Sequence, residues 1–138
     1  MRAAVEQFSG RGKPLANDAD VSAFVAAVLP LYLQKPERNL ALAQEQLLVG
    51  GIAFYAFQAQ KAADRAAGTD QASLLDRICA STLIMSGRYD WICPLPIAER
   101  LHAGIQNSRL IIFEESGHMP WIEEPGRFAA ELIPFLEG

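Results

Sequence analysis

The sequence predicts an α/β fold in which a helical segment precedes two parallel strands with flanking helices. Two short apolar runs, at residues 82–85 and 109–113, lack the alternation of a half-exposed strand and are typical of strands covered on both faces. A helical pattern lies between them, so the pair is expected to form one right-handed strand–helix–strand unit. Before residue 77 the apolar residues recur at helical spacing.

We expect three parts along the chain: a polar start at residues 1–18, a helical segment at 19–76 and an α/β segment at 77–138. The polar start contains glycine, proline and an Asn-Asp pair, which suit a loop. The whole chain has 138 residues, of which 51% are hydrophobic. That is enough for one packed core.

The helical segment is predicted to hold three helices. The first begins at Asp20, a possible N-cap, and ends at a proline. The second begins at Pro36 and ends at the glycine pair Gly50-Gly51. The third covers residues 52–67 and is rich in alanine.

In the α/β segment, the helix between the strands is expected to open at Pro94 or Pro96. A last helix begins near Pro125, and Pro134 is expected to bend it or end it early. Two parallel strands are not a complete sheet, because an exposed edge leaves backbone groups unpaired. We therefore expect the remaining strands to belong to another polypeptide, or to have been lost from this one.

Composition excludes several classes of function. The net charge of −4 argues against binding to nucleic acid or to anionic membranes. No apolar run approaches the roughly 20 residues of a membrane span, and the start has no signal-peptide pattern, so a cytoplasmic location is expected. Cys79 and Cys93 are too few and too far apart for a zinc knuckle or a disulfide framework. They are expected to be reduced thiols, and no metal or cofactor is predicted.

One carboxylate and one imidazole follow the two predicted strands. Asp90 comes after the first strand and Gly87, a glycine that could take the positive φ of a sharp turn, and His118 comes after the second strand. The carboxyl ends of adjacent parallel strands meet at one edge, where ligands bind. Alternatively, Asp90 caps the following helix or simply closes a turn, and His118 is a hydrogen-bonded surface group, as expected for His102 on the predicted helix.

Large apolar side chains flank this pair. Trp91, Met119 and Trp121 could line a substrate pocket, or they could pack beneath the loops. The neighbouring glutamates are interpreted as a solvated acidic rim, or as charges that the dipole of the last helix favours, and are assigned no role. These are Glu114, Glu115, Glu123 and Glu124.

The chain offers no evident nucleophile. None of its serines lies in Gly-x-Ser-x-Gly, the motif of a nucleophile elbow. Cys93 follows Asp90 by three positions and could approach His118 as a Cys-His-Asp site, although the sequence shows no elbow around it. We expect the nucleophile to lie outside this chain.

Over residues 74–137 the sequence resembles the C-terminal half of an α/β-hydrolase of the proline-iminopeptidase-like and esterase-like group, which carries a helical cap. The resemblance rests on Ser-Gly-Arg-Tyr-Asp-Trp-Ile-Cys-Pro, Phe-Glu-Glu-Ser-Gly-His-Met-Pro and Glu-Glu-Pro-Gly-Arg-Phe. Residues 20–70 resemble the later helices of such a cap more loosely. The resemblance implies that Asp90 is the acid and His118 the general base of a catalytic triad.

The same resemblance implies hydrolysis of an ester, an amide or an N-terminal prolyl bond, with a small molecule or short peptide as substrate. Without the nucleophile elbow the chain is expected to be inactive alone, and a partner chain would carry the serine. The alternatives are a catalytically inactive remnant, a binding module that self-associates, or the dehalogenase or carbon–carbon hydrolase chemistry of related families.

Overall fold

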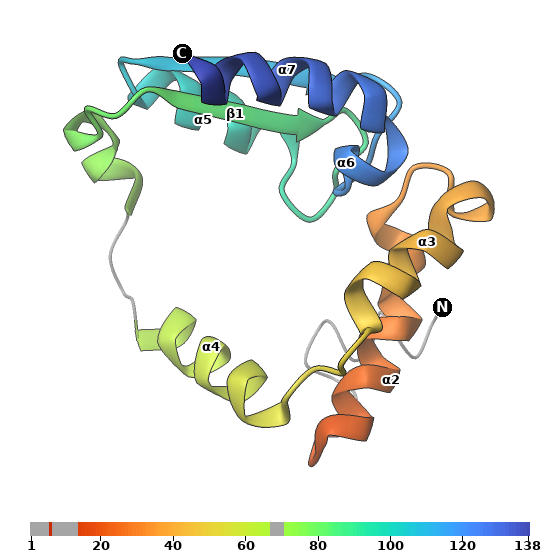
Figure 1. Ribbon diagram of the computed structural model, residues 1–138. Helices are drawn as coiled ribbons and strands as arrows, with labels where there is room; N and C mark the ends of the chain where they lie inside the picture. Colours follow the sequence, from red (N-terminus) through yellow and green to blue (C-terminus); the bar gives the residue numbers. More distant parts are fainter. Residues whose placement is uncertain (1–5, 7–13, 67–70) are drawn as a thin grey trace. The chain divides into compact units, whose positions relative to one another are not determined.

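The computed structural model describes residue 6, residues 14–66 and residues 71–138 (Figure 1). The chain divides into two compact units. The first takes in the described residues of 1–31 and 40–69, and the second takes in Tyr32–Asn39 and Asp70–Gly138. Most of the polar start and residue 67 of the third predicted helix lie outside the described residues.

Within residues 14–66 the structure has the three α-helices that the sequence predicts and a short 3-10 helix that it does not predict. They are α2 (Asp18–Val28), η1 (Leu29–Tyr32), α3 (Pro36–Leu48) and α4 (Phe54–Ala66). The start predicted for α2 is wrong, because its N-cap is Asn17, whose side chain accepts from Asp20 N at 3.0 Å. Asp20 in turn accepts from Ala16 N at 2.9 Å. The two side chains satisfy backbone donors reciprocally, so the helix begins one turn earlier.

In the first unit, α2 and α4 contact each other at two places. Asp18 accepts from Phe54 N at 2.7 Å, which caps the start of α4. The rings of Phe24 and Phe57 meet edge to face with centroids 6.1 Å apart. Val21 is fully buried, so the apolar stripe read from the sequence does face a core.

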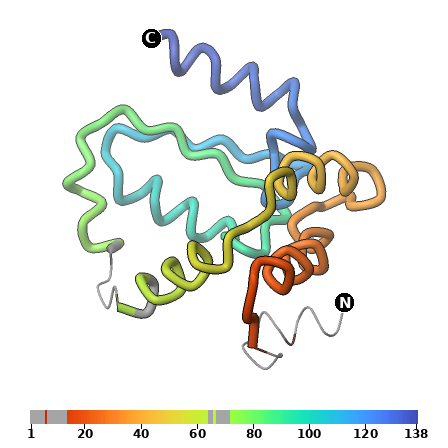
Figure 2. Tube along the Cα trace, turned by 60° about the horizontal axis from the view of Figure 1, so that its bottom comes forward, coloured from red at the N-terminus to blue at the C-terminus, as the bar shows by residue number. Residues whose placement is uncertain are grey.

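The second unit contains the predicted strand–helix–strand arrangement. Its elements are η2 (Gln71–Arg77), β1 (Thr82–Gly87), α5 (Leu95–Gly104), β2 (Ser108–Phe113), α6 (Pro120–Glu123) and α7 (Pro125–Glu137). β1 and β2 are parallel as predicted, with Thr82 opposite Ser108 and Gly87 opposite Phe113. Helices α5 and α7 lie on opposite sides of this sheet (Figures 1 and 2).

Helix α7 continues past Pro134, so the expected early end is wrong. Pro134 lies in the last turn, where a missing N–H costs a single helical hydrogen bond. The apolar side of α7 contacts β2, since the rings of Phe128 and Phe113 have centroids 6.0 Å apart. Neither α7 nor any other helix in the described part of the chain is long and apolar enough to cross a membrane.

The sheet formed by the described residues has two strands, and its middle is only half-buried. Ile84 is 9% exposed, but Leu83 and Met85 beside it are intermediate in burial, as are the central residues of β2. The apolar runs predicted strands covered on both faces. The covering is incomplete here because no further strand borders β1 within the described residues.

Candidate active site

Asp90 and His118 are brought together at the carboxyl ends of β1 and β2. Asp90 is 8% exposed. Its Oδ1 accepts from the N–H groups of Ile92 and Cys93, both at 2.9 Å. Its Oδ2 lies 2.8 Å from Nδ1 of His118. The carboxylate is therefore oriented by its own loop and presents one oxygen to the imidazole.

The contact with Asp90 determines what the His118 ring can do. A neutral imidazole that donates its Nδ1 proton to a carboxylate carries its lone pair on Nε2. The His118 side chain is 30% exposed, so the ring is not sealed in the core. This arrangement suits a general base whose positive form the adjacent carboxylate would stabilise.

Gly87 allows the two loops to approach each other closely. A Cβ at this position would overlap the carbonyl oxygen of Gly117 and lie 2.5 Å from that of Ser116. Next to it, Tyr89 N donates to the same Ser116 oxygen at 3.0 Å. Gly87 does not use the positive φ that a glycine can take in a sharp turn: among the described glycines only Gly50 and Gly51 have one. The smallness of Gly87 matters here, rather than its backbone freedom.

Residue Tyr32 reaches the site from the helical half of the sequence but belongs to the same compact unit. Its carbonyl oxygen accepts from His118 N at 2.7 Å. Its ring meets the His118 ring edge to face at a centroid distance of 5.2 Å. Burial, followed by the charges of Cys93 and Asp90, raises the pKa of the Tyr32 phenol above its ordinary value. No local pattern in the sequence points to this contact.

A cavity of about 520 Å³ lies beside the Asp90–His118 pair. Residues 83–87 of β1 all line it, together with Ile97, Leu101, Trp121 and Phe128. Successive strand residues point to opposite faces, so a cavity lined by five in a row follows the backbone edge of the strand. The pair therefore stands at the end of an open, largely apolar strand edge.

Known proteins that resemble this chain are hydrolases. The pimeloyl-[acyl-carrier protein] methyl ester esterase of Neisseria meningitidis is 37% identical over 79 residues, which are 57% of this chain and 31% of that protein. A proline iminopeptidase of Saccharolobus solfataricus is 35% identical over 68 residues, 49% of this chain and 22% of that protein. A 2-hydroxy-6-oxononadienedioate/2-hydroxy-6-oxononatrienedioate hydrolase of Cupriavidus pinatubonensis is 38% identical over 68 residues, 49% of this chain and 24% of that protein.

The solved esterase EaEST of Exiguobacterium antarcticum superposes on 99% of this chain with a TM-score of 0.71 and 28% identity, over 47% of its own length. The chain is a partial α/β-hydrolase. It spans less than a third of the length of each curated relative above and about half of the solved esterase. No protein-family model matches it.

In this partial α/β-hydrolase, the three predicted substrate-binding residues take different places. Trp121 lines the cavity and meets the ring of Phe128 edge to face at 6.3 Å. Met119 is 2% exposed and belongs to the core. Trp91 is 45% exposed and is not among the residues that line this cavity.

Cys93 does approach the pair, as the alternative Cys-His-Asp site would need. Ligand atoms of Asp90, Cys93 and His118 lie within 4.8 Å of one another, a spacing that could also hold a metal ion. However, burial and the charge of Asp90 raise the pKa of the Cys93 thiol. A nucleophilic cysteine needs a lowered pKa, so these surroundings oppose that role. Both oxygens of Asp90 already accept hydrogen bonds, with which a metal would compete.

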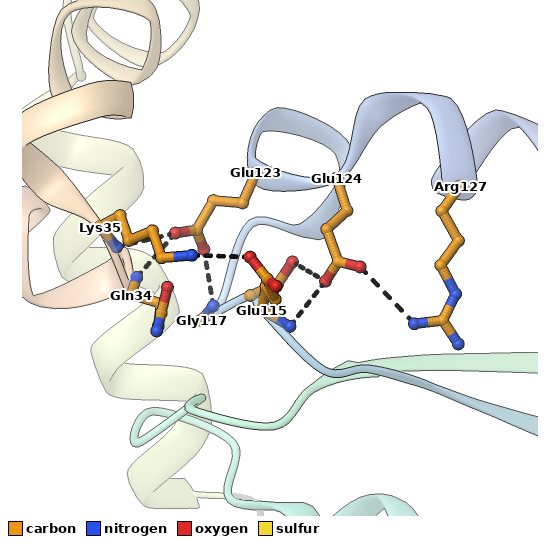
Figure 3. Close-up of polar contacts among 8 residues, drawn as sticks. Gln34, Lys35, Glu115, Gly117, Glu123, Glu124 and Arg127 are labelled. Atoms are coloured by element: carbon orange, nitrogen blue, oxygen red, sulfur yellow. Dashed lines mark hydrogen bonds and ion pairs between the residues drawn. The ribbon is translucent and has the colours of Figure 1, made fainter.

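The interpretation of the glutamates as a solvated rim is correct for two of the four. Glu114 pairs with Arg88 and Glu115 with Lys35, and both glutamates are exposed. The hydrogen bond to each partner lowers the pKa of the glutamate. Glu123 and Glu124 are not solvated, because they are half-buried and accept hydrogen bonds from the His118 loop (Figure 3). Glu124 is the N-cap of α7, which agrees with the alternative of a charge near the start of the last helix.

Ser116 and His102 have structural roles. Ser116 is fully buried and donates to Glu124 at 2.7 Å, so it supports the loop. His102 is exposed and its Nδ1 lies 2.9 Å from Ser108 Oγ, as expected of a surface histidine. Cys79 and Cys93 are free thiols.

Proposed function

We propose that this chain supplies the acid and the base of a serine-type α/β-hydrolase, with Asp90 orienting His118. The supporting observation is the 2.8 Å contact between buried Asp90 and Nδ1 of His118 at the carboxyl ends of two adjacent parallel strands. The relatedness to esterases and other hydrolases supports the same reaction class.

In this mechanism His118 Nε2 takes the proton from a serine hydroxyl as its oxygen attacks the substrate carbonyl. The proton passes to the leaving group as the bond to the carbonyl carbon breaks and an acyl-enzyme forms. Water then attacks the acyl-enzyme, with His118 again accepting and returning a proton. Throughout, Asp90 holds the ring by Nδ1 and stabilises the imidazolium.

The serine is proposed to lie on a segment that extends the sheet from β1. The edge of β1 that no strand pairs within the described residues borders the cavity, and Asp90 and His118 line the same cavity. A strand added along this edge would cover residues 83–87 and would bring its own carboxyl end to the pair, where catalytic loops lie in such sheets. Because none of the serines present lies in Gly-x-Ser-x-Gly, the nucleophile is assigned to that segment.

An ester is the proposed substrate class, because the meningococcal relative and the solved neighbour are both named as esterases. The apolar lining of the cavity suits an acyl chain or another uncharged group. The runner-up is cleavage of a carbon–carbon bond, favoured by the similarity to the 2-hydroxy-6-oxononadienedioate hydrolase. An amide or N-terminal prolyl substrate is the third candidate, from the similarity to the proline iminopeptidase.

The test is labelling with a fluorophosphonate, which reacts with a serine that a histidine has activated. The protein is purified natively from its source and the labelled polypeptide is identified by intact mass. We expect the label on a longer chain that contains these residues, or on a co-purifying partner, and its loss in a His118→Ala variant. A single unlabelled chain of 138 residues would refute the proposal and favour an inactive remnant.

A further inference from the structure

Residues 32–35 and the loop that carries His118 meet along their backbones. The carbonyl oxygen of Tyr32 accepts from His118 N, and a side chain on Gly117 would come within 2.5 Å of the same oxygen. So close an approach brings backbone N–H groups of both segments together. Such groups need acceptors when they are taken from water.

The Glu123 carboxylate supplies acceptors for both segments (Figure 3). Its Oε1 accepts from Gln34 N at 2.7 Å and from Lys35 N at 3.2 Å. Its Oε2 accepts from Gly117 N at 2.6 Å. Hydrogen bonds to an ionised carboxylate are stronger than neutral ones. One side chain of the short helix α6 thus links two segments that are far apart in sequence.

The position of His118 depends on both linked segments. Its backbone N–H donates to the carbonyl oxygen of Tyr32. Its ring meets the Tyr32 ring edge to face, and its Nδ1 contacts Oδ2 of Asp90. The neighbouring Glu124 acts differently, because it accepts from Glu115 N and Ser116 Oγ of the His118 loop and pairs with Arg127 of α7, and has no hydrogen bond to residues 32–35. Glu123 alone of these two glutamates joins the loop to the Tyr32 segment.

We infer that Glu123 is a positioning residue of the hydrolase site, which fixes residues 32–35 to the Gly117–His118 backbone and thereby holds Tyr32 against the imidazole. The effect on catalysis rests on the proposed function. The link between the two segments does not, because it consists of hydrogen bonds to the backbone.

Variants of Glu123 separate charge from size. Glu123→Gln keeps the length of the side chain but replaces one acceptor oxygen by an NH₂ donor, which would face a backbone N–H group. Glu123→Asp keeps the charge but is shorter by one methylene and is expected to reach the two segments less well. Glu114→Gln is the matched control, because that exposed carboxylate binds the side chain of Arg88 instead.

Hydrogen exchange of the backbone amides tests the link without any activity. In Glu123→Gln we expect the amides of Gly117 and of Gln34 and Lys35 to exchange about tenfold faster, because an opened hydrogen bond exposes each one. Glu114→Gln is expected to leave all three unchanged. Unchanged exchange in Glu123→Gln, or faster exchange in one segment alone, would overturn the inference.

Kinetics test the positioning role in the native hydrolase, with active sites counted by fluorophosphonate. For a small ester we expect kcat per labelled site to fall about tenfold in Glu123→Gln and less in Glu123→Asp, with KM little changed. Full kcat per site would overturn the role, because a purely structural effect only lowers the number of sites. An unlabelled wild-type protein would refute the proposed function instead, and hydrogen exchange would still decide the link.

Discussion

At the scale of single residues, the site depends on how Asp90 is held. Two N–H groups of its own loop fix one carboxylate oxygen, and the other oxygen faces Nδ1 of His118. The short loop after β1 therefore orients the Asp90 carboxylate independently of its contact with His118. This preorganisation lets the carboxylate select one tautomer of the imidazole.

Asp90→Asn is expected to lower kcat of the native hydrolase by about 10⁴-fold, because an amide at this position no longer favours the tautomer with its lone pair on Nε2. Active sites are counted with fluorophosphonate and turnover of an ester is measured. Asp76→Asn serves as control, since Asp76 is an exposed aspartate ahead of β1. A loss smaller than tenfold in Asp90→Asn would contradict the assigned role.

Tyr32 offers a spectroscopic prediction at the same scale. Burial and the nearby acidic groups favour its neutral phenol, so its pKa in the folded protein lies above the ordinary value of 10.0. The neutral form is thus preferred by the folded state, and this preference lowers stability as the pH rises above 10. In an ultraviolet difference titration between wild type and Tyr32→Phe, we expect a midpoint above 10. A midpoint at or below 10 would show that the ring is not packed as described.

At the scale of elements, the end of β1 and the His118 loop are matched in shape. Hydrogen bonds from Arg88 N to Phe113 O at 2.8 Å and from Tyr89 N to Ser116 O at 3.0 Å continue the pairing of β1 and β2 into the loops. Gly87 gives the room for that contact. The loop that positions Asp90 is therefore coupled directly to the loop that positions His118.

Gly87→Ala is expected to destabilise the second unit by about 1–3 kcal/mol, because the new methyl group overlaps rigid backbone rather than a movable side chain. The measurement is the urea midpoint of unfolding. Gly126→Ala in α7 is the matched control, since nothing lies within 4 Å of the added Cβ. It is expected to stabilise by about 0.5 kcal/mol. Equal midpoints for the two variants would contradict the close approach.

Beyond single elements, the outer edge of β1 pairs with no strand among the described residues. This edge borders the cavity, and Leu83 and Met85 on either side of buried Ile84 are only half-buried. An exposed strand edge with apolar surface promotes pairing with another chain. In the proposed hydrolase this edge would receive the segment that completes the sheet, and in the isolated chain we expect it to promote self-association.

When the 138-residue chain is produced alone, we expect it to associate, which light scattering coupled to size exclusion would report as a mass above that of one chain. Leu83→Lys places a charge at the open edge and is expected to shift the equilibrium toward the monomer. Leu42→Lys is the control, because Leu42 is exposed on α3 and does not lie at this edge, and it is expected to leave the association unchanged. A wild-type chain that is monomeric at all concentrations would contradict this prediction.

Local patterns were enough to predict the five longer helices apart from some of their ends, the two parallel strands, and the positions of Asp90 and His118 after them. These features follow from local periodicity and from the rule that adjacent parallel strands end at one edge. Prediction from local sequence patterns failed where the role of a residue depends on a neighbour that is far away in the sequence. Gly87 is required by the backbone of Gly117, and Glu123 is a backbone acceptor only because residues 32–35 lie against the His118 loop. These roles become visible only in the folded chain, because hydrogen bonds and close contacts depend on distances between residues that are far apart in the sequence.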